Sequence, residues 1–92
     1  MIPQCNTDVL IEEIGDEVVA FAPGTGTSVV LNVTAAAILE LSTGNHSITQ
    51  IAEIIASALN ANLDQVTTDV EALVQQLAVQ GFVSLLDNNA RD

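Results

Sequence analysis

The sequence changes its hydrophobic period within the stretch Ser28-Val29-Val30-Leu31-Asn32-Val33-Thr34-Ala35-Ala36-Ala37-Ile38-Leu39-Glu40-Leu41. Up to Leu31 the pattern alternates, which is typical of a strand with one buried face. From Asn32 onward the apolar residues recur at helical spacing, and no linker separates the two patterns. We therefore predict a strand over residues 27–32 that leads directly into a helix. Val29 and Leu31 are expected to face the core, and Ser28 and Val30 the opposite side.

Two runs upstream of this junction are also compatible with strands. Residues 8–14 and 17–22 are joined at Gly15-Asp16, a short turn signal that favours a hairpin. Pro23-Gly24-Thr25-Gly26 then separates the second run from the junction strand, since proline fixes φ and glycine accepts a positive φ. Together these signals predict three antiparallel strands.

Three helical segments follow the strands. Asn32 or Thr34 caps the first, and Ser47 or Thr49 caps the second. The third begins near Asp64 and ends at Gly81. The apolar faces of the three helices contain, in order, Val33, Ala37, Ile38 and Leu41; Ile48, Ile51, Ala52, Ile55 and Leu59; and Val66, Val70, Leu73, Val74 and Leu77.

This order of elements predicts an α+β fold that is winged helix-turn-helix-like, with a three-stranded antiparallel sheet followed by three helices. A chain of 92 residues is long enough for one domain with one core. We expect a single domain over residues 8–85, between a flexible N-terminus at 1–7 and a flexible C-terminal tail at 86–92. Phe82 and Val83 are expected to pack back onto the core. The core is aliphatic, because 2% of the residues are aromatic.

The composition favours a cytoplasmic protein without a membrane span. No apolar run approaches the roughly 20 residues that a membrane helix needs. The first 14 residues lack the positive charge and the apolar stretch of a signal peptide. Cys5 is the single cysteine, so no disulfide can form within the chain.

The charge balance excludes two classes of partner. Twelve acidic residues stand against one arginine, and the formal net charge is −11. Nucleic acids and anionic membranes are bound through Lys and Arg, so neither is an expected partner. The acids are spread along the chain and form no long block. They keep the protein soluble, or they attract a basic peptide or a basic protein surface.

Side chains that carry chemistry are scarce. His46 lies in a polar loop, far in sequence from Cys5, so no nucleophile and base are paired. The acidic pairs of the hairpin, at 12–13 and 16–17, do not have the spacing of metal ligands. Gly24-Thr25-Gly26 lacks the lysine of a phosphate-binding loop. We expect no catalytic residue, no metal site and no cofactor.

Several short motifs follow one another in a fixed order. They are the acidic hairpin, the glycine-punctuated turn, Leu31-Asn32-x-Thr34-Ala35, Gly44, Ser47-Ile48-Thr49, Asp69-Val70, Leu77 and Gly81-Phe82-Val83. Over residues 7–84 this order resembles the PqqD-like family. That family is also described as the recognition element, or peptide chaperone, of ribosomally synthesised and post-translationally modified peptides.

The resemblance implies a non-catalytic, peptide-binding function. Members of the family hold the leader segment of a precursor peptide as an added strand on the third strand of the sheet, in a groove whose other wall is the third helix, and present it to a modifying enzyme. An unpaired strand edge is suited to such binding on physical grounds alone. The sequence leaves open which flank of the third helix faces the groove. One flank carries Asp69, Leu73 and Gln76, and the opposite flank carries Thr67, Glu71 and Ala78. Carried over to this chain, the peptide-binding residues are Ser28, Val29, Val30, Leu31, Asp69, Leu73 and Gln76.

Two alternatives belong to other functional classes. A winged-helix transcriptional regulator would share the fold but lacks the cations that approach phosphates. An acidic carrier-type protein would share the size and the pI of about 4.1, but the chain contains no Asp-Ser attachment pair. The unpaired edge permits either a monomer or an edge-strand dimer. Asn32 and Thr34 are interpreted as helix caps rather than peptide contacts.

Overall fold

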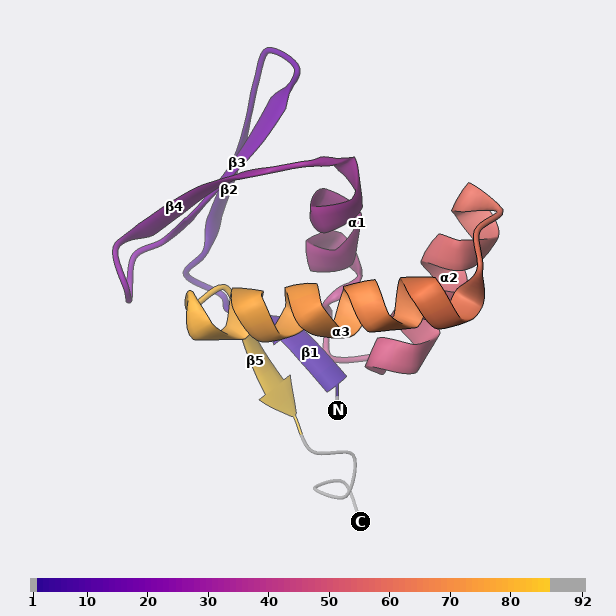
Figure 1. The fold of residues 1–92 in the computed structure, drawn as a ribbon. Helices are drawn as coiled ribbons and strands as arrows, with labels where there is room; N and C mark the ends of the chain where they lie inside the picture. Colours follow the sequence, from indigo (N-terminus) through magenta and orange to yellow (C-terminus); the bar gives the residue numbers. More distant parts are fainter. Residues whose placement is uncertain (1, 87–92) are drawn as a thin grey trace.

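The computed structural model describes residues 2–86 and contains two small sheets and three helices (Figure 1). Strands β2 (Leu10–Ile14), β3 (Glu17–Ala22) and β4 (Thr27–Leu31) form one antiparallel sheet in that order. Helices α1 (Val33–Leu41), α2 (Ile48–Leu59) and α3 (Leu63–Val79) follow it. The predicted α+β class, with a three-stranded sheet followed by three helices, is confirmed.

The β2–β3 hairpin is closed by a two-residue turn. Ile14 and Glu17 flank the turn, and Gly15 has φ 63° at its first position, as a type II′ turn requires. The flanking pair of such a turn is hydrogen-bonded, and bonded pairs alternate along an antiparallel ladder. Val19, which pairs with Glu12, is therefore also bonded to β2.

The helix caps follow the sequence signals. The Asn32 side chain accepts a hydrogen bond from the Ala35 N–H at 2.7 Å and caps α1, so Thr34 lies inside the helix. Ser47 and Gln50 form a capping box at the start of α2. Asn62 caps α3, two residues before the predicted start.

The core is aliphatic and lies where the sheet meets the helices. Phe82 is fully buried, as predicted, together with large aliphatic side chains such as Ile38, Ile51 and Leu77. Val33 differs from the prediction, because its side chain is 86% exposed. The buried face of α1 consists of Ala35, Ile38 and Leu39, and the helical spacing places Val33 away from that face.

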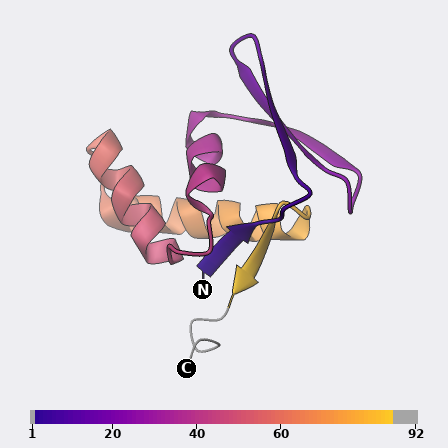
Figure 2. The same cartoon turned by 180° about the vertical axis from the view of Figure 1, so that it is seen from behind.

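The N-terminus is not a free segment. We expected residues 1–7 to be flexible, but β1 (Ile2–Cys5) pairs with β5 (Val83–Leu86) in a second, two-stranded sheet (Figures 1 and 2). The physical reason is burial: Ile2 is 8% exposed and Pro3 is fully buried. Ile2–Cys5 and Leu86 are therefore part of the folded structure, while residues 87–92 of the predicted C-terminal tail lie outside the described residues.

A side-chain hydrogen bond joins the sheet to the far end of α3. The Thr25 hydroxyl, in the loop between β3 and β4, donates to the Gln80 carbonyl at 2.7 Å. Gly81 has φ 89°, and a Cβ there would lie 2.8 Å from Thr25 Cγ2. β4 is therefore held at its start by the end of α3 and at its finish by the junction with α1. No helix within residues 2–86 is long and apolar enough to cross a membrane.

Candidate functional site

β4 is an edge strand. Within residues 2–86 it pairs with β3 alone. Because Val19 of β3 is bonded to β2, its neighbours Val18 and Ala20 direct their peptide groups to β4. Their partners on β4 are Leu31 and Val29, so these two residues hold the sheet together.

The remaining β4 residues direct their peptide groups outward. Ser28 and Val30 alternate with the bonded positions, so their N–H and C=O groups face the free edge. Ser28 is exposed and the Val30 side chain is 60% exposed. The free edge of β4 thus offers ladder positions to an extended chain without any change in the sheet.

The third helix approaches this strand at two places: Thr25, just before β4, bonds to Gln80 at the end of α3, and Asn32, just after β4, lines a cavity together with α3 residues. In Figure 1, β4 crosses above α3 and then enters α1. Asp69 and Leu73 both line a cavity at the end of β4. Gln76 is exposed one turn further along α3 and does not line the cavity. Neither Thr67 nor Glu71, on the alternative flank, lines it.

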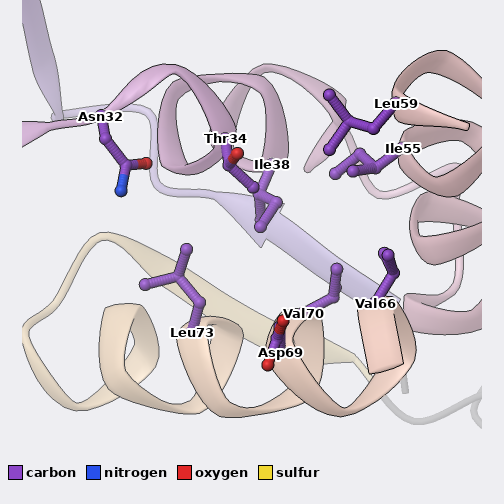
Figure 3. A pocket seen from close by; sticks show the side chains of 9 residues that line it. All are labelled: Asn32, Thr34, Ile38, Ile55, Leu59, Val66, Asp69, Val70 and Leu73. Atoms are coloured by element: carbon purple, nitrogen blue, oxygen red, sulfur yellow. The ribbon is translucent and has the colours of Figure 1, made fainter. Parts of the chain in front are cut away.

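The cavity has a volume of about 260 Å³ and lies where the three helices meet (Figure 3). Its wall is mostly aliphatic, with polar groups at the junction between β4 and α1 and on α3. Figure 3 shows the side chains of Ile38 and Leu73 directed from opposite sides toward the same space. The lining residues are Asn32, Thr34, Ile38, Ile55, Leu59, Val66, Asp69, Val70 and Leu73.

The predicted site residues are only partly brought together. Asp69 and Leu73 line the cavity that Asn32, the residue after β4, also lines, whereas Ser28 and Val30 on the strand itself do not line it. The Leu31 side chain is 7% exposed and lines a different cavity, on the other side of α1. Val29 is half-buried beside the core. Leu31 and Val29 can therefore serve the groove through the strand they stabilise rather than through their side chains.

Several cavity residues were not predicted as part of the site. Ile55, Val66 and Val70 were expected in the core, which their helical spacing indicates correctly. Thr34 was interpreted as a cap, but it lies in the first turn of α1 and lines the cavity. The cavity is the space left between three packed helices, and no pattern in the sequence indicates where such a space forms.

The electrostatics of the groove are negative. Asp69 is exposed at its rim, and its Oδ1 accepts a hydrogen bond from the Gln65 side-chain Nε2 at 3.2 Å. The single arginine of the chain, Arg91, lies outside the described residues. Burial and, to a lesser degree, the charge of Asp8 raise the pKa of the Cys5 thiol, which lies away from the groove. No group of three potential metal ligands occurs in residues 2–86.

The fold, with its open sheet edge beside a helical cavity, is of the winged-helix class. A family model described as coenzyme PQQ synthesis protein D, PqqD, matches residues 17–83. The chain belongs to the PqqD family. No curated protein matches the sequence.

Solved structures share this fold over nearly their whole length. TbiB1 in complex with the TbiA(beta) leader peptide is 21% identical, over 92% of this chain and 99% of that one, with a TM-score of 0.77. A lasso peptide synthetase B1 complexed with the leader peptide is also 21% identical, over 92% and 100%, with a TM-score of 0.78.

A third structure is the PqqD truncation of Methylobacterium extorquens PqqCD. It is 23% identical, over 90% of this chain and 88% of that one, with a TM-score of 0.71. That domain is described as a functional, stand-alone recognition element for ribosomally synthesised and post-translationally modified peptides. The family resemblance predicted from the sequence is thus confirmed.

Proposed function

We propose that this chain is a non-catalytic peptide chaperone that captures the leader segment of a ribosomal precursor peptide and presents it to a modifying enzyme. Capture occurs by addition of the leader as a strand at the free edge of β4. The observation that carries the proposal is this unpaired edge, which lies beside an apolar cavity walled by α3. Family membership and the leader peptides bound to two structures of the same fold support it.

Strand addition supplies affinity without a preformed pocket for every residue. The outward peptide groups of Ser28 and Val30 form ladder hydrogen bonds with the leader. Each such bond contributes about 0.5–1.5 kcal/mol net. These bonds involve only the backbone and would form with any extended chain, so selection of one leader depends on side-chain contacts.

The cavity and Asp69 provide that selection. A large apolar side chain of the leader enters the space between Ile38 and Leu73, where it is removed from water. A basic residue of the leader that lies near the rim is attracted by the Asp69 carboxylate. We therefore expect the bound segment to combine apolar residues with at least one Lys or Arg.

Binding of DNA by the same fold is disfavoured by charge. The α3 helix, which would enter a groove of DNA in a winged-helix regulator, carries Asp64, Asp69 and Glu71 and no cation. These carboxylates would be repelled by the phosphates instead of releasing counterions from them.

The test is calorimetric titration with candidate leader peptides, each against a shuffled peptide of the same composition. We expect saturable one-to-one binding of the leader and none of the shuffled peptide. Leu73→Asp should weaken binding at least tenfold, because it places a charge in the apolar groove. Gln75→Asp adds the same charge on the opposite face of α3 and should leave the affinity unchanged. Equal affinities for the two peptides, or for the two folded variants, would contradict the proposal.

A further inference from the structure

The β2 strand is exposed along its whole length. All five of its residues are exposed, and the side chains of Leu10, Ile11 and Ile14 are 60%, 50% and 58% accessible. Ile11 lies on the inner face of the sheet, while Leu10 and Ile14 lie on the outer face. Large aliphatic side chains on both faces of one exposed strand are unusual in a monomer and mark an interaction surface.

This strand is also the second free edge of the sheet. Within residues 2–86, β2 pairs with β3 alone. Ile14 and Glu12 direct their peptide groups toward β3 and are hydrogen-bonded to it. The peptide groups of Ile11 and Glu13, which alternate with them, therefore face outward. The β2 edge thus has the same open ladder as the β4 edge, on the opposite side of the sheet.

A second cavity lies beside this edge. It has a volume of about 310 Å³ and lies between the inner face of the hairpin and α1. Ile11 and Leu39 contribute apolar surface to it, and Glu13 and Glu40 contribute carboxylates. An occupant must therefore fill an apolar hollow and face acidic groups from both walls.

Glu12 and Glu13 determine which partner can use the edge. Their charges lie on opposite faces of β2 and repel any acidic strand that approaches it. A second copy of this chain would place the same carboxylates against each other, and the net charge of −11 adds to that repulsion. A basic segment is instead attracted to this edge, because its Lys or Arg side chains lie opposite the carboxylates of Glu12 and Glu13.

We propose that the β2 edge and its adjoining cavity dock the modifying enzyme, through an extended surface segment of the enzyme in which Lys or Arg alternates with apolar residues. The identity of this partner rests on the proposed function. The leader on β4 and the enzyme segment on β2 are then separated by four strand spacings of about 4.8 Å, roughly 19 Å. Both ligands occupy the sheet at once, and neither competes with the other.

The test measures both ligands on the same variants. The probes are candidate peptide-modifying enzymes and the leader peptide, each titrated separately. The double variant Glu12→Lys/Glu13→Lys reverses the charge of the β2 edge. The matched control Glu53→Lys/Glu71→Lys makes the same change in net charge on exposed positions of α2 and α3. Ile11→Pro removes an outward N–H of the β2 edge without changing the charge.

We expect the β2 charge reversal and Ile11→Pro each to weaken enzyme binding at least tenfold and to leave leader affinity unchanged. The α2/α3 control should bind both ligands like the parent protein. Enzyme affinity of the β2 variants equal to that of the control would overturn the proposal. A loss of leader affinity in these variants would show that β2 holds the leader instead, and would also overturn it.

Two further outcomes separate this proposal from others. If the leader fails to bind the parent protein but enzyme binding still depends on β2, the proposed capture function fails and the docking surface stands. If sedimentation velocity shows a dimer of the parent protein that Ile11→Pro dissociates, the β2 edge is a self-association surface and the proposal is wrong.

Discussion

Replacement of Val30 by proline tests strand addition at β4 directly. The Val30 N–H faces the free edge rather than β3, so proline removes a ladder donor without breaking a bond of the sheet. Its side chain is 60% exposed, so little packing is lost. We expect the free energy of unfolding to fall by no more than about 1 kcal/mol, the range of β propensity in a host protein.

The effect on binding should be larger than the effect on stability. Without the Val30 N–H, one carbonyl of the bound leader is buried without a donor, which costs about 1–3 kcal/mol. At 1.4 kcal/mol for each factor of ten, the dissociation constant rises roughly 5- to 150-fold. The proline ring at the edge also hinders the approach of a strand, which places the result toward the upper end of that range.

The assay is calorimetric titration of folded variants with the leader, after thermal unfolding has verified each fold. Ile11→Pro is the matched control, since it removes an outward N–H from the other edge of the same sheet. We expect it to bind the leader like the parent protein. Equal leader affinities of Val30→Pro and Ile11→Pro would refute strand addition at β4, whatever the remaining affinity of either variant.

Three further predictions concern other parts of the molecule. Asn32→Ala removes the α1 cap and should lower the free energy of unfolding by about 1 kcal/mol, or the melting temperature by about 4–8 °C. An unfolding curve identical to that of the parent protein would contradict the capping role. Gly81→Ala should lower the free energy of unfolding, measured in urea, by more than about 1 kcal/mol, because φ is 89° there and the new Cβ would clash with Thr25. Gly24→Ala is the control: its Cβ would lie 3.9 Å from the nearest atom, so its stability should be nearly that of the parent protein. Burial raises the pKa of the Cys5 thiol, so the reactive thiolate forms at higher pH than in a free model thiol. The pH at which the alkylation rate of Cys5 reaches half its maximum should therefore lie above that of the model thiol. A midpoint at or below the model value would contradict the raised pKa.

The sequence was most informative where local pattern and tertiary packing agree. The alternation up to Leu31 predicted β4 and its exposed face, and the two candidate caps, Asn32 and Thr34, placed the start of α1 to within two residues. Glu17–Ala22 forms a strand over the predicted residues. In these segments each residue is fixed by its immediate neighbours, so the pattern suffices.

The parts that depend on distant contacts were predicted less well. β1 contains a proline and no alternation, and its pairing with β5 joins the two ends of the described chain. The Cys5 N–H donates to the Ser42 carbonyl at 2.7 Å, which adds another contact from far along the sequence. Such a strand forms because the rest of the domain offers it a partner, and four residues alone carry no sign of that partner.

The candidate site shows the same division. The α3 residues Asp69 and Leu73 were predicted on a flank of the helix, but periodicity could not determine which flank faces the groove. The cavity required the ends of α1, α2 and α3 to meet, and this depends on how the helices cross. Thr34 illustrates the difference, because a helix-capping residue type also lines the cavity.

The most direct test of strand addition is amide hydrogen exchange of the protein with and without its leader peptide. In the free protein, the Ser28 and Val30 amides face the open edge of β4 and should exchange rapidly. With saturating leader, both should become strongly protected, while the outward amides of Ile11 and Glu13 on β2 should not change. Protection confined to Ile11 and Glu13, or a bound leader that protects neither edge, would contradict leader capture at β4.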